Sequence, residues 1–90
     1  MTDIIIENII ASTNIEPIDL EQLHNNLENS QINYELDEEE NTIPLSVLWE
    51  NNNGIALVLF NDGRLVSVQA TTIEDATESI EDYIEMLKTL

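Results

Sequence analysis

The sequence has no cysteine and, among its 90 residues, only two basic ones, Arg64 and Lys88. Without cysteine there can be no disulfide bonds, thiolate metal sites or cysteine nucleophiles. Two cations cannot build a basic patch, which is the usual electrostatic footprint of a nucleic-acid binder. No apolar run approaches the ~20 residues of a membrane-spanning helix, and no signal peptide opens the chain. We therefore expect a soluble, cytoplasmic protein without a membrane partner.

Acidic residues are abundant instead: 19 Asp and Glu give a formal net charge of −17. Hydrophobic residues still make up 42% of the chain, which is enough for a folded core rather than a disordered acidic tail. The length predicts a single domain, 1–90, with one modest core. The near absence of Lys in a chain rich in Ile and Asn indicates selection against basic residues. A salty cytosol, a partner that requires a negative surface, or a generic solubilising surface would each explain it.

The first part of the chain predicts a strand, a helix and a second strand. Residues 4–14 are apolar and β-branched, as is typical of a strand, and the Glu16–Pro17 pair ends it because proline has no N–H for the ladder. Asp19 is the predicted N-cap of a helix that ends near Glu28. Residues 30–36 alternate apolar and polar side chains, which predicts a half-buried strand.

Three more strands and a helix follow an acidic run at 37–41, which we expect to be a solvated loop. The strands are predicted at 43–50, 55–60 and 64–70, joined by turns that contain Asn-Gly and Asp-Gly. The last helix, 73–90, is capped by Thr72 and has one apolar and one acidic face. The order predicts an α+β two-layer sandwich: a five-stranded antiparallel sheet with two helices on one face.

Such a sheet has a second face that no helix covers, and function should be sought there. Strand alternation assigns one set of side chains to the open face and another to the helices, and a slip of one residue would exchange the two sets of a strand. Both sets are largely apolar, and a large exposed apolar patch marks a binding surface. The helix-facing set is Ile9, Ala11, Leu48, Leu57, Leu59 and Leu65. The open-face set is Asn8, Ile10, Ile43, Leu45, Val47, Trp49, Val58, Phe60, Arg64, Val66 and Val68.

No constellation of catalytic residues is present. The sequence has no nucleophile elbow and no phosphate-binding glycine loop, and its single histidine, His24, is expected on the solvent side of a helix. The acidic run lacks the ligand spacing and the glycine of an EF-hand loop. We therefore expect no enzyme, no metal site, no cofactor and no small-molecule substrate.

Three segments resemble one repeat of the TATA-binding protein core. They are ENIIASTNI followed by IDLEQL, then ALVLFNDGRLVSVQA, then TTIEDATESIEDYIEMLKTL. The resemblance implies a β-α-β4-α half-saddle with a curved sheet. In TATA-binding proteins, which are themselves the standard example of this mode, two such repeats bind the minor groove of TA-rich DNA, and Phe side chains wedge between base steps.

The resemblance also implies roles for individual residues. Asn8 matches the Asn that contacts base edges, and Phe60 matches one wedging Phe. Arg64 matches a basic phosphate contact. The apolar groove contacts are matched by Ile10, Val58 and Val66.

Several positions depart from the family pattern. Ile43 stands where the family has its other wedging Phe, Trp49 where it has a basic residue, and Val68 where it has Thr. The loop before Ile43 carries four acids, 37–40, which would repel phosphates.

Only one repeat is present, so an apolar edge strand at 4–14 would be left exposed, and exposed edges pair with partners. We expect a twofold homodimer that rebuilds the saddle. Apart from a small-ligand or structural role on this fold, two functions remain open. One is a nucleoid-associated transcription factor that reads TA-rich double-stranded DNA. The alternative is an acidic protein-interaction module, or DNA mimic, that binds a TATA-binding protein or another transcription factor. DNA binding measured from low to molar salt separates them.

Overall fold

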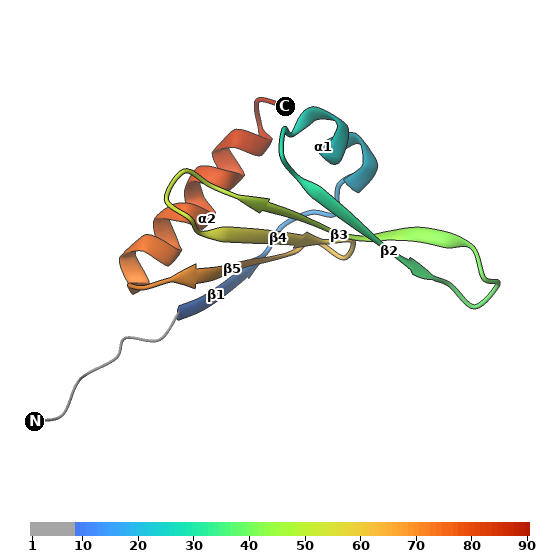
Figure 1. Cartoon of the computed structure of the whole chain (residues 1–90), viewed down its shortest axis with the longest axis horizontal. Helices are drawn as coiled ribbons and strands as arrows, with labels where there is room; N and C mark the ends of the chain where they lie inside the picture. The colour runs from blue at the N-terminus through green and yellow to red at the C-terminus, as the bar shows by residue number, and fades with distance from the viewer. Residues whose placement is uncertain (1–8) are drawn as a thin grey trace, which may run out of the picture.

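The computed structural model describes residues 9–90 and shows a sheet of five antiparallel strands with two helices (Figure 1). The strands lie in the order β1-β5-β4-β3-β2. The predicted element order and the α+β architecture are confirmed. The part of the predicted first strand before residue 9 lies outside the described residues. The elements are β1 (Ile9–Asn14), α1 (Leu20–Asn26), β2 (Gln31–Leu36), β3 (Thr42–Glu50), β4 (Ala56–Phe60), β5 (Arg64–Ala70) and α2 (Ile73–Leu87).

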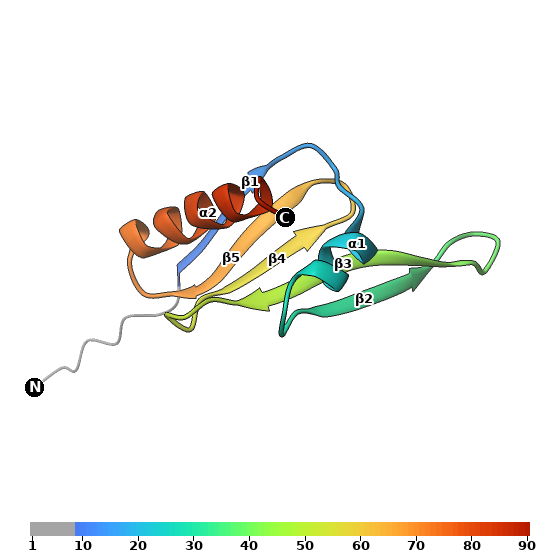
Figure 2. The ribbon, with the colours of Figure 1, turned by 90° about the horizontal axis from the view of Figure 1, so that it is seen from above.

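Both helices lie on the same face of the sheet (Figure 2). The shorter helix, α1, packs on β2 and β3, and α2 packs across β1, β5 and β4. Between the helices and the sheet lies one main core, in which the apolar stripe of each helix meets alternate residues of the strands. Its buried members are Leu20, Leu23, Leu27, Val47, Leu57, Leu59, Leu65, Ile80 and Tyr83.

Side-chain caps fix where the helices begin. The carboxylate of Asp19 accepts hydrogen bonds from the backbone N–H groups of Glu21 and Gln22, at 3.0 and 3.2 Å. The hydroxyl of Thr72 accepts one from the N–H of Asp75 at 3.0 Å. These oxygens satisfy N–H groups that have no partner inside the first helical turn. Both caps are the ones that the sequence predicts, although α1 and α2 end slightly earlier than predicted.

The β2–β3 hairpin extends beyond the other strands and the helices (Figures 1 and 2). Its acidic turn is ordered by its own first residue, because the Asp37 carboxylate accepts hydrogen bonds from the N–H groups of Glu39 and Asn41, at 2.9 and 2.8 Å. Glu38, Glu39 and Glu40 are exposed. The predicted acidic loop is thus a tight, solvated turn at the tip of the hairpin.

A β-bulge divides β3 into two parts. Asn33 of β2 pairs with Ser46, but the next residue, Tyr34, pairs with Pro44. Leu45 is therefore an extra residue on β3, and an extra residue reverses the inward and outward alternation of side chains along a strand.

Candidate functional site

The face of the sheet opposite the helices is lined by side chains that the strand register brings together. Residues directly opposite each other in an antiparallel pair point to the same face. The register places one row across all five strands, with an apolar centre and a polar residue at each edge. That row is Ser12, Val66, Val58, Leu48 and Gln31.

Two shorter rows flank this central row. One contains Phe60 and Ser46, which pair between β4 and β3, together with Asn33 of β2. The other contains the paired Ala56 and Val68. None of the open-face apolar residues belongs to the core beneath the helices, and Val58, Phe60 and Val68 are only half-buried. An apolar sheet face that no helix covers is a candidate binding surface.

Phe60 and Arg64 form the distinctive pair of this face. They flank the β4–β5 turn, and the guanidinium carbon of Arg64 lies 5.8 Å from the centroid of the Phe60 ring. That distance suits a cation–π contact. The backbone N–H of Arg64 donates to the Asp62 carboxylate at 2.9 Å, which fixes the turn between them. The pair thus places an aromatic ring and a cation side by side, with the Asp62 carboxylate in the turn between them.

The prediction that Val47 and Trp49 belong to the open face is wrong. Val47 pairs with Leu59, and Trp49 pairs with Leu57, so both point toward the helices. The Trp49 ring lies 5.8 Å from the ring of Tyr83 on α2, centroid to centroid. The cause is the bulge at Leu45, because the extra residue shifts the alternation of everything that follows it on β3.

The bulge has the opposite consequence for Leu48, which was predicted to face the helices. Its pairing with Val58 places it at the centre of the open face. Ile43 lies beyond the bulge and pairs with Glu35, two residues from Asn33 along β2, so it shares the open face. Leu45 is the bulged residue itself, where the register gives no face.

Two further predicted site residues belong to the strand that the sequence predicts at 4–14. Asn8 lies outside the described residues. Ile10 is 69% exposed, whereas its neighbour Ile9 packs with the core formed by Ile55, Ala70 and Ala76. Ile10 is therefore on the open face.

The open face has little positive charge. Among the described residues Arg64 is its only cation, while Glu35 and Glu50 share the face through their pairing with Ile43 and Ala56. At one end of the face a hollow of about 390 Å³ lies beside a second bulge, in β5, where Gln69 has a φ of 72°. The hollow is lined by Asn29, Gln31, Leu48, Glu50, Ala56, Val68 and Gln69.

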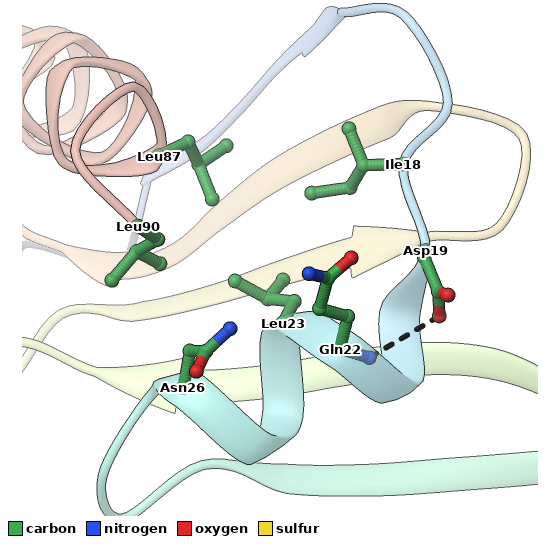
Figure 3. A pocket seen from close by; sticks show the side chains of 7 residues that line it. All are labelled: Ile18, Asp19, Gln22, Leu23, Asn26, Leu87 and Leu90. Atoms are coloured by element: carbon green, nitrogen blue, oxygen red, sulfur yellow. Dashed lines mark hydrogen bonds between the residues drawn. The ribbon is translucent and has the colours of Figure 1, made fainter.

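A separate groove lies on the helix side, between α1 and the end of α2. Figure 3 shows Leu87 and Leu90 facing Leu23 of α1 and Ile18 across this groove. It encloses about 200 Å³. The Asp19 carboxylate at its edge already accepts the helix N–H of Gln22, so it is a cap rather than a free reactive group.

The described residues bring no group of three or more His, Cys, Asp or Glu together in a way that could hold a metal ion. No helix between residues 9 and 90 is long and apolar enough to cross a membrane. His24 is half-buried on α1, and its ring nitrogen Nδ1 lies 2.8 Å from the Ser30 hydroxyl, which indicates a structural role.

The comparison with known proteins agrees with this geometry. The model of the family described as "Transcription factor TFIID (or TATA-binding protein, TBP)" matches residues 3–90. The TATA-box-binding protein of Methanothermobacter thermautotrophicus is 34% identical over 89 residues, which cover 98% of this chain and 46% of that protein. The chain therefore spans about half the length of this relative. No solved structure gives a significant match.

Proposed function

The chain belongs to the TATA-binding protein family, and from that premise we propose that its open face binds TA-rich DNA through the minor groove. The family supports a role in transcription. The observation that carries the finer proposal is the composition of the open face: an apolar centre of Val58, Val66 and Leu48, with Phe60 and Arg64 at one end. Proteins that bend DNA from the minor groove insert apolar side chains between base steps and hold phosphates with cations.

We propose further that two copies of the chain form the complete binding surface. β1 is an edge strand: it pairs with β5 on one side, and no described strand lies on the other. An unpaired edge presents N–H and C=O groups that a second copy can satisfy. Pairing of two β1 edges would continue the sheet and double the length of the open face. Light scattering at tens of micromolar protein should give the mass of a dimer, and a monomer would refute this part of the proposal.

The charge of the chain sets the conditions under which DNA would bind. The acids of α2 lie on the opposite side of the sheet from the open face, so most of them are remote from bound DNA (Figure 2). The acidic turn 37–41 is not remote, because it ends the hairpin that extends the open face. Salt screens repulsion between exposed charges. Binding should therefore strengthen as salt rises, whereas ordinary protein–DNA binding weakens.

The test is a fluorescence anisotropy titration of a TA-rich duplex from about 0.1 M to several molar salt. We expect binding to appear or strengthen with salt and to depend on Phe60. The Phe60→Ala variant should lose it, while Ile73→Ala should keep it. Ile73 is a suitable control because it is an exposed apolar residue on α2, away from the open face. Absence of binding to the duplex at every salt concentration would refute the proposal.

A second function is favoured by the carboxylates near the open face. Glu35, Glu50 and the acidic turn give this face a negative rim, as expected of a surface that substitutes for DNA. In this alternative the chain binds a TATA-binding protein or another transcription factor. The same titration separates the two functions. A chain that fails to bind the duplex but competes with it for a full-length TATA-binding protein is a DNA mimic.

A further inference from the structure

The outer part of the β2–β3 hairpin, residues 34–45, is an arm that projects from the sheet (Figures 1 and 2). The ladder between β3 and β4 begins at the pair of Ser46 and Phe60, so no third described strand lies beside the arm. A two-stranded hairpin is only marginally stable in water by itself, and a bulged strand bends where the extra residue is inserted. The angle between the arm and the sheet therefore depends on what is bonded at the β3 bulge.

Asn61 connects the arm to the rest of the open face at this bulge. Its backbone N–H donates to the Leu45 carbonyl at 2.9 Å, which continues the β3–β4 ladder as far as the bulge. Its side-chain Nδ2 donates to the Pro44 carbonyl at 2.9 Å and to Glu35 Oε1 at 3.4 Å. Within residues 9–90, no other side chain forms a hydrogen bond between the arm and another element.

The β4–β5 turn does not need the Asn61 side chain for its own geometry. Asn in a turn commonly bonds to the backbone of that turn, as Asn51 does in the β3–β4 turn. Here the turn is closed by the N–H of Gly63, which donates to the Phe60 carbonyl at 3.0 Å. Asn61 does not have a positive φ, so residues with a Cβ fit its backbone without strain. The amide can therefore be removed without loss of the turn.

The two acceptors of the Asn61 side chain lie on either side of Ile43. Pro44 follows Ile43 along β3, and Glu35 is the partner of Ile43 on β2. Phe60 directly precedes Asn61, and both Ile43 and Phe60 lie on the open face. Asn61 thus joins the segment that carries Ile43 to the segment that carries Phe60.

We propose that Asn61 is a positioning residue, which holds the arm at a fixed angle so that Ile43 and Phe60 act as one wedge against DNA. The inference rests on the proposed function of the open face. Apolar wedges unstack base steps and kink the duplex. A wedge formed by side chains from two segments requires that the segments keep their relative position, because a site with loose supporting residues loses its geometry.

The experiment compares Asn61→Ala with Asn52→Ala. Asn52 is a suitable control because it is exposed, does not have a positive φ, and lies in a turn whose side-chain hydrogen bonds are made by Asn51. In the protein without DNA, N–H residual dipolar couplings report the orientation of the arm relative to the sheet. Asn61→Ala should reduce the couplings of the arm relative to those of β4 and β5, whereas Asn52→Ala should leave both unchanged.

Hydrogen exchange gives the size of this effect. The backbone N–H at position 61 bonds to Leu45 across the bulge, so its exchange rate reports how often the junction opens. Loss of the side-chain bonds in Asn61→Ala should raise that rate by about three- to tenfold. In Asn52→Ala the rate should stay as in the wild-type chain.

The second measurement follows the DNA. A TA-rich duplex with a fluorophore at each end reports its bend by energy transfer, at a salt concentration where the wild-type chain binds. Asn61→Ala should bend the duplex less and bind it about three- to tenfold more weakly. Asn52→Ala should match the wild-type chain in both respects.

Three outcomes would overturn the positioning role while leaving the proposed function intact. The first is an arm in Asn61→Ala with wild-type couplings and exchange. The second is an equal reduction of the couplings in the arm and in the sheet, which would mean a general loosening of the fold. The third is a loosened arm that still bends the duplex as the wild-type chain does. Absence of wild-type binding at every salt concentration is a different result, because it refutes the proposed function itself and the wedge with it.

Discussion

The two faces of the sheet are both apolar, yet they differ in what covers them. On the helix side Leu57, Leu59 and Leu65 are 0% exposed beneath α1 and α2. On the other side Val58 and Phe60, which alternate with Leu57 and Leu59 along β4, are half-buried, and no described element covers them. An antiparallel sheet packed on one side normally presents polar residues to water on the other. This difference is the reason for the proposal that the uncovered apolar face is a binding surface.

The largest expected effect is a difference in stability between substitutions on the two faces. Leu57→Ala should lower the free energy of unfolding by about 2–5 kcal/mol, because it leaves a cavity in the core. Val58→Ala, one residue along the same strand, should lower it by about 1 kcal/mol or less, because part of that side chain already contacts water. Urea unfolding measures both. Equal losses would mean that the open face is as much a part of the core as the helix side.

The next effect concerns Tyr83, the buried tyrosine on the helix side, and how it makes stability depend on pH. Tyr83 has a pKa of about 12 in the folded chain, against 10.0 for an unperturbed tyrosine. Above pH 10 the unfolded chain loses this proton while the folded chain keeps it. The free energy of unfolding should therefore fall as the pH rises from about 10 to about 12, by up to about 2–3 kcal/mol.

The matching variant shows whether Tyr83 causes this fall. Tyr83→Phe should remove most of it, whereas Tyr34→Phe should leave it, since Tyr34 is 47% exposed. Thermal unfolding at several alkaline pH values gives the comparison. An identical decline in the two variants would show that Tyr83 is not the responsible group.

A smaller effect tests the β3 bulge, which decides which side chains of β3 lie on each face of the sheet. Leu48→Ser should weaken binding of the open face to its ligand by about five- to tenfold, with a modest cost in stability, because Leu48 lies beside Val58 at the centre of that face. Val47→Ser should instead destabilise the fold, because Val47 is completely buried. Anisotropy and urea unfolding on both variants check this. A reversed pattern would place Leu48 beneath the helices.

The smallest effect concerns the backbone at the end of the open face. Gln69 has a φ of 72° at the β5 bulge, a conformation that glycine adopts at less cost than any residue with a Cβ. Gln69→Gly should raise the melting temperature slightly, by the equivalent of about 0.5–1 kcal/mol. Gln31→Gly, on the edge strand β2 where the residue does not have a positive φ, serves as the control and should lower the melting temperature.

Much of the fold could be predicted from local signals. Asp19, Thr72 and the Asn-Gly and Asp-Gly turns each act within a few residues, so their effect can be judged from the sequence. The assignment of β3 side chains to the two faces could not be predicted from alternation. One phase of the run, Ile43, Leu45, Val47 and Trp49, is wholly apolar, and a regular strand would place all four on one face.

The signal that could have revealed the bulge is Pro44. Proline inside a strand is confined to edges and bulges, and here it stands next to the extra residue, Leu45. For this reason the prediction of the site residues was less accurate than the prediction of the fold. A bulge leaves the strand in place but exchanges which side chains reach the open face, as it did for Trp49 and Leu48.

The most direct test of the central claim, that the open face is the binding surface, is an NMR titration of labelled protein with a TA-rich duplex at high salt. The account predicts shifts at Ala56, Val58, Phe60, Val66 and Val68, with little change at buried residues of α2 such as Ala76 and Ile80. Shifts concentrated on α2, with the open-face signals unmoved, would contradict it.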